Sequence, residues 1–127
     1  QVVSRFNILR VVEHYGSTEM PGAAVLNWTN KSGSCGYVPP SIRLLREYGD
    51  RIIRYNVLDG CIERDPATGF CIECKTGEAG ELIMPLPKAK YDGYVDPNAT
   101  HNKIYRNVFR EGDTWWSSGD LLSIGML

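Results

Sequence analysis

The chain has 127 residues, of which 43% are hydrophobic and 23% charged, and its formal net charge is −1. This composition is typical of a folded globular domain and excludes a disordered or fibrous protein. The near-neutral charge does not support nucleic acid as a partner, and no apolar run reaches the roughly 18 residues that span a bilayer.

Both ends of the chain fall within apolar patterns. Gln1 precedes a run of hydrophobic residues without an initiator Met, and residues 121–127 form a second apolar run. We therefore expect an internal piece of a longer protein, in which targeting signals lie outside these residues.

The first third of the chain predicts the tail of an α/β subdomain, over residues 1–36. Residues 9–15 combine β-branched and aromatic side chains and break at Gly16, which predicts a buried strand that ends in a loop. A second apolar run covers residues 23–27, and the pair Pro39-Pro40 marks a change of character.

Residues 37–127 predict a β-rich subdomain, either a small antiparallel sheet or a distorted β-barrel. Short strand-like runs alternate there with turns rich in Gly, Pro and Asp. The fold class is thus α/β plus β. The predicted strands are residues 51–55, 70–74 and 81–84, and a short helix is predicted over residues 97–105.

The segment Tyr15-Gly16-Ser17-Thr18-Glu19, here called the N-terminal motif, joins an aromatic ring, a glycine, two hydroxyls and a carboxylate. After a strand that ends at a sheet edge, Ser17 and Thr18 can donate hydrogen bonds to a phosphoryl oxygen. Glu19 is a hard oxygen ligand suited to Mg²⁺. The alternative is an ordinary strand-to-turn transition with a solvated Glu19.

The segment Trp116-Ser117-Ser118-Gly119-Asp120, here called the C-terminal motif, places a carboxylate directly after a glycine. Asp120 can accept hydrogen bonds from both hydroxyls of a ribose, and Gly119 lets the backbone approach a ligand. Trp115 and Trp116 alternate in a strand, so one is expected in the core and the other along a cleft. The alternative is an Asp-Gly turn beside two core tryptophans.

Four cysteines are present: Cys35, Cys61, Cys71 and Cys74. The pair Cys71/Cys74 has half of a zinc-ribbon pattern, but the other two stand alone. We expect reduced thiols in an intracellular protein, and no zinc. A non-enzymatic β-rich metal-binding or interaction module is the alternative.

Five segments in order resemble the adenylate-forming acyl-CoA synthetase superfamily. Besides the two motifs, Gly33 to Pro39 is similar to its glycine-proline loop, Gly77-Glu78-Ala79-Gly80-Glu81-Leu82 to its Gly-Glu-x-Gly-Glu-Leu turn, and residues 93–100 to its Gly-Tyr…Pro-x-Ala-Thr segment. Residues 64–71 and 106–113 most resemble the very long-chain acyl-CoA synthetases, also called fatty acid transport proteins.

The resemblance implies an AMP-forming fatty acid–CoA ligase that uses ATP, Mg²⁺ and coenzyme A. Tyr15 would stack on adenine, with Gly16 and Ser17 beside the nucleotide. Thr18 would contact the α-phosphate and Glu19 would hold Mg²⁺, as the catalytic residues. Asp120 would bind the ribose, whereas Glu78 and Glu81 would be structural.

The resemblance also implies fatty acid, ATP and CoA as small-molecule partners, and it allows association of the full protein with the endoplasmic reticulum or peroxisomal membrane. A short-chain or aryl-acid CoA ligase is the alternative within the superfamily. Met20-Pro21-Gly22 departs from the family, which often has Gly directly after the acid. Because the phosphate-gripping loop and the small C-terminal domain are missing, the 127 residues alone are expected to be inactive.

Overall fold

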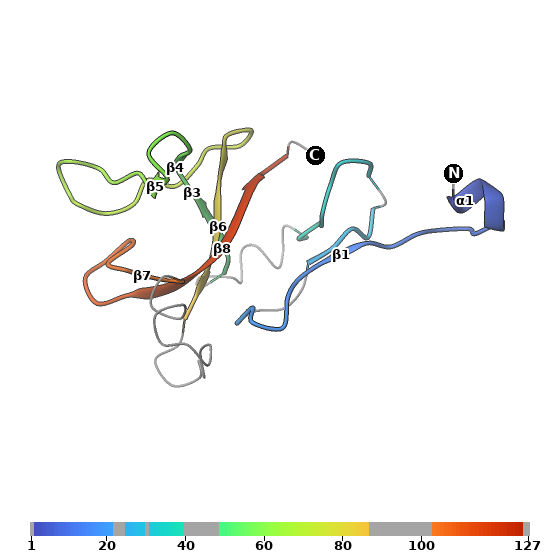
Figure 1. The fold of residues 1–127 in the computed structure, drawn as a ribbon, viewed down its shortest axis with the longest axis horizontal. Coiled ribbons are helices and arrows are strands. Elements are labelled where there is room, and N and C mark those ends of the chain that lie inside the picture. The colour runs from blue at the N-terminus through green and yellow to red at the C-terminus, as the bar shows by residue number, and fades with distance from the viewer. Residues whose placement is uncertain (1, 22–24, 30, 40–48, 87–102, 126–127) are drawn as a thin grey trace. The chain divides into compact units, whose positions relative to one another are not determined.

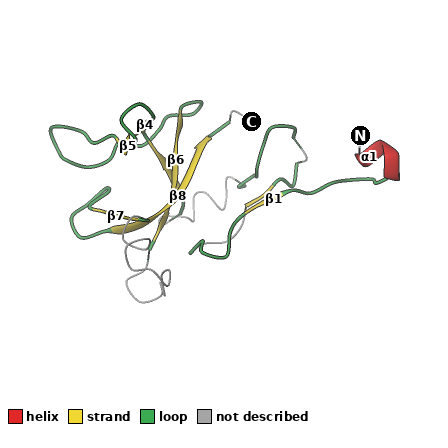
Figure 2. Cartoon of the chain, viewed as in Figure 1, coloured by secondary structure: helices red, strands yellow, loops and turns green. Residues whose placement is uncertain are grey.

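The computed structural model describes residues 2–21, 25–29, 31–39, 49–86 and 103–125 (Figure 1). The chain divides into two compact units, residues 1–47 and residues 48–127. Strands and loops make up most of the described residues (Figure 2). None of the helices in this part of the chain has the length and apolar character that a membrane crossing requires.

The first unit contains a short helix and a two-stranded antiparallel ribbon. Helix α1 spans Val2–Phe6, and strands β1 (His14–Tyr15) and β2 (Val25–Leu26) pair with each other. The predicted buried strand over residues 9–15 is therefore wrong in its extent. Leu9 is fully exposed, and within the described residues only the last two positions of that run have a partner strand.

The second unit is built on a four-stranded antiparallel sheet. Its strand order is β3-β6-β8-β7, with β3 at Arg51–Ile53, β6 at Ala79–Pro85, β7 at Ile104–Arg106 and β8 at Thr114–Ser123. β6 lies inside the sheet and is buried along most of its length, including its apolar residues Leu82, Ile83 and Met84. A separate ribbon pairs β4 (Tyr55–Asn56) with β5 (Cys61–Ile62).

One core cluster of the second unit lies on one face of this sheet. Partly buried Ile62, Tyr105 and Phe109 pack against it, and the rings of Phe109 and Trp115 meet edge to face at 5.1 Å. The fully buried side chains include Ile53 and Ile83. The core cluster consists of Ile53, Cys71, Ile83, Val108 and Trp115.

The loop between β7 and β8 is organised by one carboxylate. Asp113 accepts hydrogen bonds from the backbone N–H groups of Val108 (2.6 Å), Phe109 (3.0 Å) and Arg110 (3.2 Å). It also accepts one from the indole N–H of Trp115, at 3.0 Å. These donors lower the pKa of Asp113, even though burial alone would raise it.

Three predicted local structures differ from those observed. Residues 70–74 form isolated bridges at Cys71 and Glu73 rather than a continuous strand. Residues 97–102 of the predicted helix lie outside the described part, but Ile104 and Tyr105 belong to β7 because they pair with β8. Both tryptophans of β8 are buried, at 8% and 3% exposure, so neither lines an open cleft as expected.

Candidate functional site

The N-terminal motif begins in β1 and continues as an exposed turn. Tyr15 is half-buried and pairs with Val25, whereas Gly16, Ser17, Thr18 and Glu19 are exposed. The backbone N–H of Met20 donates to the carbonyl of Ser17 at 3.3 Å, which closes the turn. The two hydroxyls and the carboxylate therefore stand on one short surface segment.

A buried asparagine anchors the ribbon that carries this motif. Asn27 is 2% exposed, and its side-chain amide donates to Glu13 at 3.2 Å and to the carbonyl of Lys31 at 3.1 Å. Its side-chain oxygen accepts from the backbone N–H of Lys31 at 3.2 Å. Asn27 was not among the residues predicted from the sequence, although a polar residue that closes an apolar run is a recognisable sign of such an anchor.

The segment similar to the glycine-proline loop lies against β2. The backbone N–H of Tyr37 donates to the carbonyl of Leu26 at 2.8 Å. A Cβ at Gly36 would stand only 1.9 Å from Cγ1 of Val25, so no larger residue fits at this position without movement. The loop thus packs closely against β2 and is hydrogen-bonded to it.

The C-terminal motif lies on β8. Asp120 is exposed, and its backbone N–H donates to the hydroxyl of Ser118 at 3.0 Å. Gly119 has a φ of +78°, in the left-handed region that favours glycine. The carboxylate of Asp120 is thus presented at a local distortion of the strand rather than on a regular stretch.

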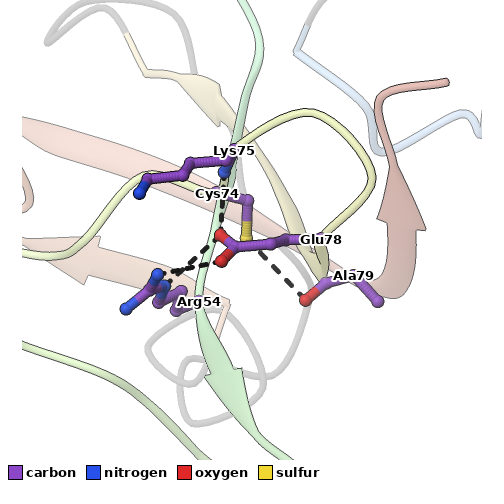
Figure 3. Close-up of polar contacts among 5 residues, drawn as sticks. All are labelled: Arg54, Cys74, Lys75, Glu78 and Ala79. Atoms are coloured by element: carbon purple, nitrogen blue, oxygen red, sulfur yellow. Dashed lines mark hydrogen bonds and ion pairs between the residues drawn. The ribbon is translucent and has the colours of Figure 1, made fainter. Parts of the chain in front are cut away.

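The turn before β6 is held by Glu78 (Figure 3). Its carboxylate accepts from the backbone N–H of Lys75 at 2.8 Å and from Arg54 at 2.9 Å. The Lys75 N–H and the Arg54 side chain lower the pKa of Glu78. The structural role predicted for Glu78 agrees with these contacts.

The Cys71/Cys74 pair is buried and free, with no disulfide between the two residues. Burial raises the pKa of both thiols, which keeps them protonated at neutral pH. Cys71 belongs to the core cluster, and Cys74 Sγ lies 3.7 Å from the carbonyl oxygen of Ala79 (Figure 3). In the described part of the chain, no group of three or more Cys, His, Asp or Glu residues has a geometry that could hold a metal ion.

Arg64 joins the two segments that resemble the fatty acid transport proteins. Its guanidinium donates to the carbonyls of Gly69 at 2.9 Å, Asn107 at 2.6 Å and Arg106 at 3.0 Å. Residues 64–71 and 106–113 are therefore parts of one structural feature, although some forty positions separate them in the sequence.

The structure gives the local form of each motif within its own unit. The approach of the N-terminal motif and Asp120 to one nucleotide stays a prediction, as do the ligand roles of all these residues. The Gly-Tyr…Pro-x-Ala-Thr segment, residues 93–100, lies outside the described residues.

No family profile matches the chain, and no solved structure matches it. It is 36% identical to long-chain fatty acid transport protein 1 of Mus musculus over 126 residues, which are 96% of the chain and 19% of the relative. It is 31% identical to the very long-chain fatty acid transport protein of Saccharomyces cerevisiae over 126 residues, 93% of the chain and 19% of the relative.

A third relative is named as a ligase. The chain is 32% identical over 124 residues to the medium/long-chain-fatty-acid–CoA ligase FadD6 of Mycobacterium tuberculosis, with 97% of the chain and 19% of the relative covered. The chain thus spans about a fifth of the length of the curated relatives that it matches. These similarities along nearly the whole chain confirm the resemblance noted from its motifs: the chain belongs to the family of long-chain and very long-chain fatty acid transport proteins and fatty-acid–CoA ligases.

Proposed function

We propose that this chain supplies nucleotide-binding residues to an ATP-dependent, AMP-forming fatty-acid–CoA ligase. In the first step the fatty acid carboxylate attacks the α-phosphate of ATP, giving an acyl-adenylate and pyrophosphate. In the second step the thiol of coenzyme A displaces AMP from the acyl carbon. The observation that carries the proposal is the similarity to a medium/long-chain-fatty-acid–CoA ligase over 97% of the chain, which includes both motifs.

The N-terminal motif is suited to contact the base and the phosphates of the nucleotide. Tyr15 offers a ring for stacking on adenine, and Gly16 leaves the backbone beside it open. The hydroxyls of Ser17 and Thr18 stand on the exposed turn, where Thr18 can donate to the α-phosphate. These donors stabilise the charge that develops on that phosphate during attack.

Glu19 fits a role as a ligand for Mg²⁺. A magnesium ion bound to a triphosphate takes one or two protein carboxylates together with phosphate and water oxygens, so a single exposed carboxylate is a sufficient protein contribution. The bound ion supplies charge neutralisation on the phosphates. Glu19 itself orients the metal–nucleotide complex relative to the hydroxyls of the same turn.

Asp120 is suited to the ribose end. It is exposed on β8, and its backbone is fixed by the hydroxyl of Ser118. A carboxylate that accepts both ribose hydroxyls adds about 1.5–3 kcal/mol for each charged hydrogen bond. The ribose lies between the adenine and the α-phosphate of the nucleotide, so this role of Asp120 complements those proposed for Tyr15 and Thr18.

The fatty acid transport names of the relatives favour a fatty acid over a short-chain or aryl acid as substrate. The location of the protein, inside the cell and at the endoplasmic reticulum or peroxisomal membrane, stays a prediction. So does the inactivity of the 127 residues alone.

The test uses the full-length ligase, meaning a protein of the relatives' length that contains this chain. Fatty-acid-dependent exchange of pyrophosphate into ATP measures the first step, and formation of acyl-CoA measures the second. We expect both activities, with oleate or a longer fatty acid as substrate. Absence of acid-dependent exchange with fatty, short-chain and aryl acids, in a folded protein, would overturn the proposal.

A further inference from the structure

Strand β8 contains a bulge directly at the C-terminal motif. One residue of β6, Leu82, faces three residues of β8, 118–120. Such insertions bend a strand and redirect the side chains that follow. The positive φ of Gly119 lies within the bulge, and Asp120 is its last residue. The direction of the Asp120 carboxylate therefore depends on what holds the bulge in place.

A buried carboxylate lies beneath the bulge. Glu81 is 2% exposed, and its Oε1 accepts from the backbone N–H of Gly119 at 3.2 Å and from the hydroxyl of Ser117. Its Oε2 accepts from the hydroxyl of Tyr105 at 2.8 Å. Burying a carboxylate is costly unless donors surround it, and these three donors meet that need.

The hydroxyl of Tyr105 on β7, which donates to Glu81, keeps its proton. Burial and the hydrogen bond to Glu81 raise the pKa of Tyr105, so its hydroxyl stays protonated and keeps donating at neutral pH. Glu81 is consequently held through Oε2 by Tyr105 of β7 and through Oε1 by the backbone of β8.

The opposite side of the bulge is held by a lysine. Lys103 Nζ donates to the carbonyl of Ser118 at 3.0 Å, and the carbonyl of Lys103 accepts from the backbone N–H of Ser117 at 2.8 Å. A Cβ at Gly119 would stand 2.9 Å from that Nζ, so the glycine also leaves room for the lysine. The bulge is thus fixed at Ser118 and at Gly119 by different groups.

We propose that Glu81 is a positioning residue for Asp120: by holding the Gly119 amide it sets where the Asp120 carboxylate meets the ribose. This inference rests on the proposed ribose role of Asp120. Glu81 touches no nucleotide and acts only through the bulge. Its effect is therefore confined to ribose recognition, whereas a residue needed only for folding affects all substrates together.

The test compares ATP with 2′,3′-dideoxy-ATP as substrates of the full-length ligase, because the analogue lacks both ribose hydroxyls. Glu81→Leu removes both acceptor oxygens and is expected to reduce the preference for ATP, as a ratio of kcat/KM values, by about tenfold. Glu81→Gln keeps an oxygen for Gly119 and an amide that can donate to the Tyr105 oxygen. We expect it to retain the preference within about twofold.

Two further variants complete the design. Tyr105→Phe keeps the ring in the core and removes one donor to Glu81, so it carries the test if Glu81→Leu does not fold; the expected loss of preference is about threefold. Glu78→Gln is the matched control, because Glu78 binds Arg54 and Lys75 away from the bulge. It should leave the preference unchanged, and KM for the fatty acid and for CoA should be unchanged in all variants.

The outcomes separate this inference from the proposed function. If Asp120→Ala abolishes the preference for ATP while folded Glu81→Leu and Tyr105→Phe retain it, the positioning role is overturned and the ribose site stands. If the Glu81 variants lower activity with ATP and the analogue equally, the residue is structural and the inference is also overturned. If Asp120→Ala itself retains the preference, the ribose site falls, and the role of Glu81 falls with it.

Discussion

The two units of the chain support their motifs in different ways. In the second unit, Asp120 lies on a strand of a four-stranded sheet with its own core. The other two residues of the bulge, Ser118 and Gly119, are held by hydrogen bonds. In the first unit, Asn27 is the one buried residue among those described, and the N-terminal motif begins at the last residue of a two-residue strand. A two-stranded ribbon is marginal by itself. We infer that the ribose end of the site is preorganised locally, whereas the phosphate end depends on further packing.

Core truncation should show this contrast most strongly. Ile83→Ala removes a fully buried side chain from the sheet, and we expect it to lower the free energy of unfolding by about 2–5 kcal/mol. Leu26→Ala in the first unit removes a side chain that is 44% exposed and should cost less than about 0.5 kcal/mol. Urea unfolding of the 127-residue chain measures both, and equal losses would contradict the contrast.

Removal of the ribose contact should have the next largest effect. Asp120→Ala in the full-length ligase is expected to weaken ATP binding by about 2–4 kcal/mol, because two charged hydrogen bonds are lost. Titration calorimetry measures the change. Glu111→Ala, which removes an exposed acid from the β7–β8 loop, is the control and should leave affinity unchanged. An unaltered ATP affinity in Asp120→Ala would count against the ribose role.

A change at Glu19, the proposed metal ligand in the first unit, should lower the rate of adenylation. Glu19→Gln keeps the shape of the side chain but weakens Mg²⁺ coordination, so we expect adenylation to slow by about 10- to 100-fold. Single-turnover formation of the acyl-adenylate measures this step. Glu13→Gln alters an acid that contacts Asn27 rather than the nucleotide, and adenylation should proceed normally in it. Equal slowing in both variants would indicate damage to the ribbon.

The β7–β8 loop offers a smaller and pH-dependent test. Asp113→Asn should lower the free energy of unfolding by about 1–2 kcal/mol, because the amide nitrogen cannot accept from the donors around Oδ1 and Oδ2. The pKa of Asp113 is lowered in the folded chain, so its stabilisation is complete above the unfolded value of about 4 and is lost as the pH falls through the folded value. The difference in free energy of unfolding between wild type and Asp113→Asn should therefore become smaller at acidic pH.

Urea unfolding of wild type and Asp113→Asn at neutral pH and at about pH 3 measures that difference. A difference that stays constant across this range would mean that the charge of Asp113 contributes nothing.

The sequence allowed local turns and the roles of residues within them to be predicted better than the pairing of strands. The turn before β6 follows from its Gly-Glu-x-Gly pattern, and the role of Glu78 follows from its place in that turn. The bulge at residues 118–120 depends on how β6 and β8 register, which no local pattern encodes. Glu81 was expected to be structural, but its link to Gly119 arises only from that pairing.

The extent of β1 and the position of the tryptophans show the same limit. The apolar run before Tyr15 is typical of a buried strand, yet a strand extends only as far as it has a partner. Alternation placed Trp115 and Trp116 on opposite faces, but burial on each face depends on what other strands and loops cover it.

The central claim is that Glu19 and Asp120 bind the same nucleotide, Glu19 through Mg²⁺ at the phosphates and Asp120 at the ribose hydroxyls. A crystal structure of the full-length ligase with ATP and Mg²⁺ tests it most directly. The account predicts a Glu19 oxygen at about 2.1 Å from the metal and Asp120 oxygens at about 2.6–3.0 Å from the ribose hydroxyls of the same ATP. An ATP molecule bound with either carboxylate on a separate surface would contradict it.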